Sequence, residues 1–364
     1  MIADAHFHIF PPMGGASGHP SVRDHARYMQ RGLALHHLPV RKAEDASVVQ
    51  QQVLIQEPDY TLQGLSDKDF RSGGFGRLMW TADGVDYYKQ YLPPLLTDLS
   101  APPELGVAQM DHAGVSRAVI HNGHLYGKLN RYISRALKRY PDRFWGTASV
   151  DEWRAHHKSQ TAALDHAMDD LGLHALWFDT QNIALNGRQE TVDHRVFQPF
   201  WEHVRDRKVP VFWNTPQPEP SRASYLSSMA ALGRWLKRYP DIPCVYTNGF
   251  PFGYFRGRRG VRFPQELWDT LSAPNLMVEV TFPIVEGWMW DYPFKEFQPI
   301  IRQMYRRLGP EHMVWGSDMP NVERYCTYRQ CREYMKYCSF IPPHHMDLIW
   351  GGNIARLFAD GKAR

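Results

Sequence analysis

Short apolar runs and amphipathic stretches alternate along most of the chain. From about residue 105 onward, each run typical of a buried strand is followed by a stretch with the longer period of a helix. The predicted strands cover residues 2–9, 117–121, 143–150, 175–179, 210–214, 243–248, 276–282 and 312–318. The predicted helices cover residues 104–113, 130–140, 160–171, 197–208, 225–239, 265–271, 294–308, 328–338 and 346–358. Strands separated by helices in this way predict an α/β fold, a (β/α)8 TIM barrel forming a single domain over residues 1–364.

Residues 11–103 interrupt this alternation directly after the first strand. The segment is rich in Gly, Pro and His, and it holds one plausible hairpin arm (48–56) and an aromatic run (87–91). In a barrel, the segments that follow strands rise from the face where active sites are built. An insertion this long is a lid or an interface, and the sequence leaves both open.

Composition narrows the class of protein. Hydrophobic residues make up 43% of the 364 and charged residues 22%, which is ordinary for a globular chain. No apolar run reaches the roughly 18–20 residues of a membrane span, and Met1 leads straight into the first strand, so we expect a cytoplasmic protein. The net charge of +4 and one short arginine cluster are too little for a nucleic-acid surface. The four cysteines form no Cys-x-x-Cys pair, which favours reduced, structural thiols.

Two motifs at opposite ends of the chain carry candidate chemistry. The first strand reads Asp4-Ala5-His6-Phe7-His8, and the last leads into Trp315-Gly316-Ser317-Asp318-Met319-Pro320. Because alternate side chains of a strand share a face, His6 and His8 should point the same way, with Asp4 one layer below. A closed barrel brings its first and last strands together. The pattern therefore predicts a divalent metal held by His6, His8 and Asp318.

These motifs, together with Trp350-Gly351-Gly352-Asn353-Ile354-Ala355-Arg356-Leu357-Phe358, resemble the amidohydrolase superfamily. Residues 110–119 and 140–146 are similar to its branch of aminocarboxymuconate semialdehyde, resorcylate and carboxyvanillate decarboxylases. The resemblance implies a metal in the barrel mouth, zinc first and manganese or iron as alternatives, and an oligomer of identical or homologous chains. It also implies histidines at the ends of strands five and six. This chain has Asn214 and Asn248 there.

Because asparagine stands at both positions, the expected roles in metal binding, substrate contact and proton transfer are assigned to other residues or other atoms. Asn214 could complete the metal shell through its amide oxygen, and Asn248, which cannot exchange protons, would contact substrate. Acid–base work is then assigned to Asp318 and to a histidine from elsewhere. His124 at the end of strand two is the choice, with His121 and Glu279 as further candidates.

The segments after strands six and seven are predicted to contact substrate. Arg256 and Arg259 follow strand six, and a guanidinium suits a carboxylate bidentately. Trp288 follows strand seven and would form an aromatic wall, with packing under a loop as the alternative.

Three functions fit this sequence. The first is a metal-dependent lyase or hydrolase that decarboxylates or hydrolyses a small aromatic or unsaturated carboxylate, with neither nucleic acid nor membrane as a partner. The second is one subunit of a non-haem metal hydroxylase (a monooxygenase). The resemblance extends to such a complex, the α-aminoisobutyrate hydroxylase, in which two related chains assemble and one carries a reduced site. The third is a non-catalytic scaffold with a structural metal.

Overall fold

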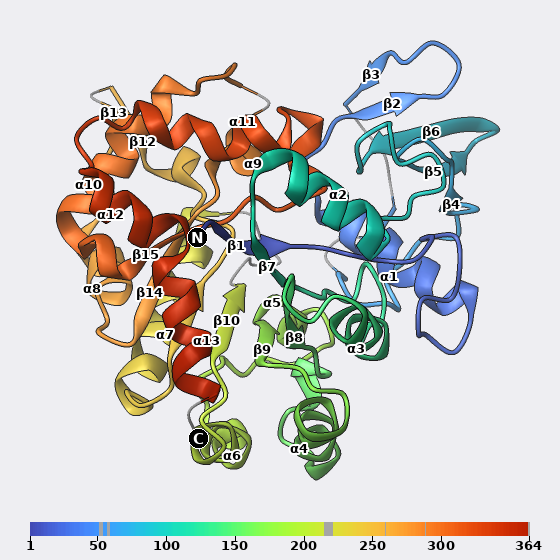
Figure 1. Ribbon diagram of the computed structural model, residues 1–364. Helices are drawn as coiled ribbons and strands as arrows, with labels where there is room; N and C mark the ends of the chain where they lie inside the picture. Colours follow the sequence, from blue (N-terminus) through green and yellow to red (C-terminus); the bar gives the residue numbers. More distant parts are fainter. Residues whose placement is uncertain (51–53, 57–58, 215–220, 259, 288, 363–364) are drawn as a thin grey trace.

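A ring of parallel strands forms the centre of the computed structural model (Figure 1), which describes residues 1–50, 54–56, 59–214, 221–258, 260–287 and 289–362. The order around the ring is β1-β7-β8-β9-β10-β11-β14-β15. Neighbouring strands are parallel and hydrogen-bonded to each other. A parallel β-bridge between Phe7 and Met319 brings β1 and the segment after β15 together. The strand bounds are β1 Ala3–Phe7, β7 Arg117–Ile120, β8 Phe144–Ala148, β9 Ala175–Asp179, β10 Val211–Asn214, β11 Cys244–Tyr246, β14 Leu276–Val280 and β15 Met313–Trp315. The predicted (β/α)8 barrel is confirmed.

Helices surround the ring in the order that the sequence predicts. Their bounds are α2 Pro103–Ala113, α3 Asn130–Arg139, α4 Lys158–Asp165, α5 Gln181–Ala184, α6 Gln198–Asp206, α7 Arg222–Arg238, α8 Gln265–Leu271, α9 Phe282–Glu286, α10 Gln298–Leu308, α11 Tyr328–Glu333, α12 Pro343–Asp347 and α13 Asn353–Lys362. Within the described residues, no helix is long and apolar enough to cross a membrane.

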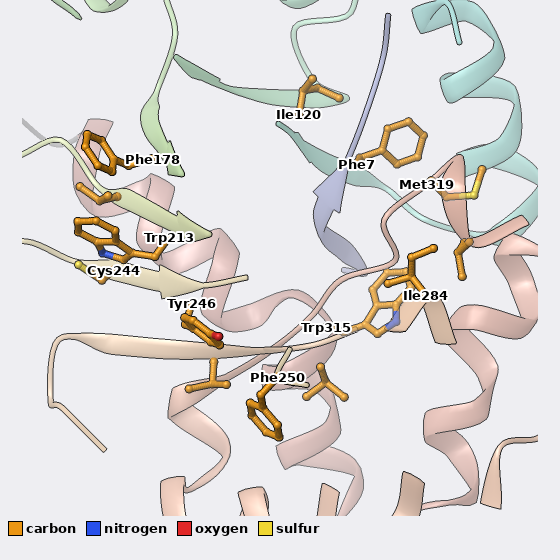
Figure 2. Packing of buried hydrophobic residues seen from close by; sticks show 14 of the residues in the cluster. Phe7, Ile120, Phe178, Trp213, Cys244, Tyr246, Phe250, Ile284, Trp315 and Met319 are labelled. Carbon is orange, nitrogen blue, oxygen red and sulfur yellow. The ribbon is translucent and has the colours of Figure 1, made fainter. Parts of the chain in front are cut away.

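Two apolar clusters hold the barrel together. The larger lies between strands and helices, and Figure 2 shows part of it, including Phe7, Phe178 and Trp213. The smaller fills the barrel interior, where Phe358 of α13 stacks on Trp145 with ring centres 4.8 Å apart. The C-terminal helix therefore packs into one end of the ring, and the candidate site lies at the other, at the carboxyl ends of the strands.

The insertion forms a small structure of its own beside the barrel (upper right in Figure 1). Helix α1 (Val22–Leu35) precedes a five-stranded antiparallel sheet in the order β3-β2-β6-β5-β4. Its strands are β2 Val40–Lys42, β3 Val48–Val49, β4 Arg71–Ser72, β5 Arg77–Ala82 and β6 Val85–Gln90. The aromatic run 87–91 thus lies mostly in β6. Part of the predicted hairpin arm 48–56 lies outside the described residues, and its described start is β3.

Candidate functional site

Each histidine of the first motif has one ring nitrogen bonded to a neighbouring part of the barrel. His8 Nδ1 lies 3.1 Å from the carbonyl oxygen of His121, and because a carbonyl only accepts, that nitrogen carries the hydrogen. His6 Nδ1 lies 3.1 Å from Glu279 Oε2. Both imidazoles are buried. In the neutral form of each ring, the other nitrogen, Nε2, has a lone pair that can bind a metal.

The carboxylate of Asp318 meets these two nitrogens. Its Oδ1 lies 2.9 Å from His8 Nε2 and 3.8 Å from His6 Nε2, and the two Nε2 atoms are 3.1 Å apart. Two ligands bound to one metal at about 2.1 Å, with an angle of roughly 90–110° between them, are about 3.0–3.4 Å apart. The spacing of the two nitrogens fits that range, whereas Asp318 Oδ1 lies farther from His6 Nε2, at 3.8 Å, and would move toward a bound ion. The three residues form a candidate site for one divalent ion.

Electrostatics at this point favour positive charge. Burial alone would lower the pKa of His6, but the carboxylates of Glu279 and Asp318 outweigh it and raise that pKa to about 9. Burial would raise the pKa of Asp318, yet the hydrogen bond with His8 and the charge of His6 lower it. Because Asp318 is stabilised as an anion beside the imidazoles, the pocket favours a cation.

Asp4 does not share the face of His6 and His8, contrary to the sequence prediction. The register of β1 against β7 shifts between Asp4 and Phe7, and such an irregularity reverses which side chains face inward. Asp4 accepts hydrogen bonds from the Ser317 backbone and hydroxyl and from the Tyr328 hydroxyl. It therefore fastens the first strand to the last instead of lining the site.

Glu279 of β14 lies behind His6 and is completely buried. Its Oε2 accepts from His6 Nδ1 and, at 2.6 Å, from the backbone N–H of Asn248. A Cβ atom on Gly316 would overlap Glu279 Oε1 and lie 2.9 Å from His6 Cβ. Glycine at 316 is what lets the two strands carry this pair so close together.

The two asparagines, Asn214 and Asn248, which stand where the family resemblance implies histidine, are bonded to each other. Asn248 Nδ2 donates to Asn214 Oδ1 at 3.0 Å, and Asn214 Nδ2 donates to Asp179 Oδ2 at 3.2 Å. Asn248 has a φ of 64°, a left-handed conformation that asparagine tolerates better than most residues. Asn214 as a metal ligand and Asn248 as a substrate contact stay predictions, and both side chains border the cavity described below.

A second group of titratable side chains lies on the wall formed by β9 and the segment after β7. His124 Nε2 is 2.8 Å from Glu152 Oε2, and Glu152 Oε1 accepts from the backbone N–H of Asp179 at 3.3 Å. Burial and the nearby Glu152 raise the pKa of Asp179 to about 7. His124 and Asp179 both border the cavity. His121 does not: its ring bonds Ala5 O and Thr147 Oγ1 beneath the site.

A cavity of about 620 Å³ opens over these residues. The insertion supplies one wall through residues of α1 and the end of its sheet, among them Tyr28, Arg31 and Tyr91. Trp177 and Arg324 belong to other parts of the lining. The volume is in the range of small-molecule sites.

The predicted substrate contacts after strands six and seven lie elsewhere or are undescribed. Arg256 is exposed in the short β12 (Arg256–Gly257) and β13 (Gly260–Val261) pair. Its guanidinium carbon lies 5.5 Å from the ring centre of Trp290, and it is not among the residues that border the cavity. Arg259 and Trp288 lie outside the described residues. The substrate roles of all three stay predictions.

Three cavity residues were missed from the sequence: Arg31, Arg324 and Asp179. Asp179 ends its strand just as Asn214 ends the next, and the two are paired in register, so the strand-end rule could have found it. Tyr28, Arg31 and Leu35 have helical spacing and all border the cavity, but the sequence does not say which face of α1 meets the barrel. Arg324 lies in a turn after β15, where no periodic signal exists.

Comparisons with known proteins agree with this architecture. The profile of a family described as amidohydrolase matches residues 3–359. No curated protein matches the chain significantly. Among solved structures, a probable 2-pyrone-4,6-dicarboxylic acid hydrolase from Acinetobacter baumannii, with citric acid bound, superposes with a TM-score of 0.56 at 19% identity. That match covers 72% of this chain and 90% of the other.

Two further solved structures have the same fold. A dihydroxybenzoic acid decarboxylase from a Polaromonas species, with manganese and the inhibitor 2-nitroresorcinol bound, gives a TM-score of 0.54 at 14% identity, covering 72% of this chain and 87% of its own. The 4-oxalomesaconate hydratase of Rhodopseudomonas palustris gives 0.54 at 15% identity, covering 100% of this chain and 97% of its own.

Proposed function

Because the chain belongs to the amidohydrolase family, we propose that it is a metal-dependent enzyme that decarboxylates or hydrolyses a small carboxylic acid. One observation carries the proposal. The three ligand atoms of His6, His8 and Asp318 converge beside a cavity whose wall also holds Arg31, a buried guanidinium. A cation site and an anion-binding side chain in one cavity are the parts that such a reaction needs.

The metal would be held by His6, His8 and Asp318, with Asn214 or water completing the shell, and zinc or manganese suits these ligands. Such an ion supplies Lewis acidity toward a substrate oxygen or a bound water. Glu279 keeps His6 in the tautomer that has Nε2 free. The manganese in the Polaromonas decarboxylase lends weight to a divalent ion here.

Arg31 would hold the substrate carboxylate. Its NH1 donates to the backbone oxygen of Leu185 at 2.8 Å, which fixes the side chain and leaves other N–H groups for a ligand. The names of two structural neighbours refer to a dicarboxylic acid and to a dihydroxybenzoic acid, which agrees with an acidic substrate. Trp177 and Tyr28 on the lining suit an aromatic or unsaturated body.

Proton transfer is assigned to cavity side chains. Asp318 and His124 keep their predicted acid–base roles, and Glu152 orients the His124 ring. Asp179, whose pKa is raised to about 7, adds a carboxyl group that is partly protonated near neutral pH. With asparagine at both 214 and 248, these are the groups that would replace the histidines found in relatives.

A second candidate function is the reduced-site subunit of a two-chain metal hydroxylase. The observation that favours it is the Asn214–Asn248 hydrogen bond, which uses amide groups at both places where a richer metal site would have imidazoles. In that case the catalytic metal centre would belong to a homologous partner chain, and this chain would contribute one structural ion.

Metal analysis and a substrate screen test the proposal. We expect about one zinc or manganese per chain, and loss of that metal in His6→Ala/His8→Ala. We also expect carbon dioxide release or hydrolysis with at least one aromatic or unsaturated acid, abolished by Asp318→Asn and kept by the surface control Asp170→Asn. Metal without activity in the isolated chain, but activity with a co-purified homologue, would favour the hydroxylase. Absence of metal would leave a scaffold.

A further inference from the structure

We propose that the substrate carries two anionic groups, one bound by Arg31 and the other by Arg324 on the opposite side of the cavity. This inference rests on the proposed function, which requires one carboxylate, and it adds the second. The proposed substrate class is a small diacid. Its two carboxylates lie at opposite ends of the molecule, and the rest of the molecule lies between the two guanidinium groups.

Arg324 is held beside the metal-binding residues by neutral acceptors. Its Nε donates to the backbone oxygen of Asn321 at 3.1 Å, and its NH1 donates to that of Tyr91 at 2.7 Å. Asn321 in turn donates to Asp318 Oδ1 at 2.8 Å. The guanidinium is thus positioned at the side of the cavity where β15 meets β1. Its positive charge meets carbonyl dipoles and the rings of Tyr91 and Tyr325, whose centres lie 5.8 and 5.3 Å from its central carbon.

Arg31 is fixed in the same manner at another place. Its NH1 donates to Leu185 O at 2.8 Å and reaches Asn186 Oδ1 at 3.4 Å. Only 2% of the residue's surface is exposed, and this burial lowers its pKa. Leu185 and Asn186 come directly after α5, which follows β9, so Arg31 is anchored on the β9 side of the mouth.

The two anchoring strands lie across the barrel from each other. Counting along the order β1-β7-β8-β9-β10-β11-β14-β15, β9 and β15 are separated by three strands in each direction around the closed ring. Both arginines border one cavity of about 620 Å³. A single ligand in this cavity can therefore meet guanidinium groups that are anchored on two different sides.

Neither charge is neutralised by the described residues. Surface arginines such as Arg71 and Arg188 pair with carboxylates, whereas in the described ranges no carboxylate oxygen lies within 4 Å of Arg31 or Arg324. Asp179 and Glu152 act on Arg31 only at longer range, and the raised pKa of Asp179 weakens it as a counter-ion. A buried cation without a paired carboxylate is costly, so each guanidinium group is suited to an anionic ligand.

The test compares diacids with esters that differ by one charge. Terephthalate, isophthalate and glutarate are each titrated calorimetrically into the zinc-loaded or manganese-loaded protein beside their monomethyl esters. We expect at least one diacid to bind 10-fold or more tightly than its ester. In Arg324→Gln and in Arg31→Gln that ratio should fall to about one, and Arg324→Lys should keep part of it. Arg23→Gln, an exposed arginine on α1, should leave the ratio unchanged.

The outcomes separate this inference from the proposed function. Thermal unfolding and metal content first confirm that each variant is folded and metal-loaded. If Arg324→Gln fails this check, Arg324→Lys takes its place. Equal affinities for diacid and ester, both weakened by Arg31→Gln, would overturn the second anion and keep the carboxylate substrate. A diacid preference that survives in Arg324→Gln would also overturn it. If no acid binds the metal-loaded protein, both proposals fail.

Discussion

The state of a single imidazole depends on two residues that never enter the cavity. Glu279 accepts from His6 Nδ1, and Gly316 leaves the room that Glu279 needs. Through this contact a carboxylate on β14 decides which nitrogen of a β1 histidine has its lone pair exposed. In metal sites, a hydrogen bond to the ring nitrogen that does not bind the metal commonly sets the orientation and basicity of the histidine.

Glu279→Gln should weaken the metal site without breaking the fold. The amide oxygen can still accept from His6 Nδ1 and from the Asn248 backbone, but the negative charge that favours a cation is gone. We expect zinc affinity to fall by about 10–100-fold, measured by competition with a chromophoric chelator. Glu311→Gln, on the surface, is the control. An affinity within twofold of the wild type would contradict this role of Glu279.

Gly316→Ala should reach the same site by steric means. The added methyl group overlaps Glu279 Oε1 and crowds His6, so the carboxylate must move away from the ring. We expect weaker metal binding together with a stability loss of about 1–3 kcal/mol, read from urea unfolding. Gly257→Ala, in the exposed β12 where an added Cβ meets only Gly260 O at 3.8 Å and φ is not positive, separates the overlap at 316 from a general glycine effect. Undiminished metal affinity in Gly316→Ala would rule the overlap out.

At the level of elements, the insertion is part of the wall of the cavity. Helix α1 places Tyr28 and Arg31 against the barrel mouth, and Lys89 of β6 donates to the last carbonyl groups of the helix, Leu33 O and His36 O. The small sheet therefore fixes the end of the helix that carries Arg31, the proposed anion-binding side chain. A lid function and an interface function of residues 11–103 both stay predictions.

The contact between insertion and barrel should be sensitive to acid. His19 Nε2 lies 3.4 Å from His124 O, and its ring stacks on His25 and Tyr28. Burial, with the neighbouring His25, His124 and Lys128, lowers the pKa of His19 to about 4. The unfolded chain takes up this proton near pH 6.5, so the stabilisation is complete above that pH and is lost as pH falls from 6.5 to 4.

The loss from His19 is at most about 3 kcal/mol, because each pKa unit is worth about 1.4 kcal/mol. Urea unfolding between pH 7.5 and 4 measures it. His19→Gln should lose less stability over this range than the wild type, whereas His344→Gln, exposed on α12, should follow the wild type. Parallel curves for His19→Gln and the wild type would show that this group does not titrate on unfolding.

For the whole molecule, the metal site is also the place where the ring closes. His6 and His8 come from β1 and Asp318 from the end of β15, so a bound ion joins the two terminal strands of the barrel. An ion that binds only the folded state stabilises it by about 2.7 kcal/mol at 100 times its dissociation constant. The proposed metal binding would therefore stabilise the barrel.

Removal of the metal should lower the melting temperature. Treatment of the metal-loaded protein with a chelator is expected to shift it down by several degrees, and added zinc or manganese should restore it. Asp318→Asn should melt at a lower temperature and respond little to either treatment. A wild-type protein that carries metal but melts at the same temperature with and without it would contradict a joining role.

The sequence predicted those parts of the molecule whose hydrophobic residues recur with the period of a strand or a helix. Buried parallel strands read as short apolar runs, so the order of strands and helices and the convergence of His6, His8 and Asp318 could be derived. Asp4 was placed on the wrong face because one register shift in β1 overrides strict alternation. Arg31 and Arg324 were missed because their places depend on how α1 and a turn pack against the barrel, which no local pattern encodes.

The hydrogen bonds of Asp4 to Ser317 join residues 313 positions apart, and this separation has a consequence for biosynthesis. The ribosome adds about 5–20 residues per second, so Asp4 and the two histidines wait about 15–60 s before their partners are made. A nascent chain holds two imidazoles and no Asp318. If the proposed ion binds, its uptake would follow the synthesis of residue 318, and the cell would supply the metal to a chain whose first and last barrel strands are both made.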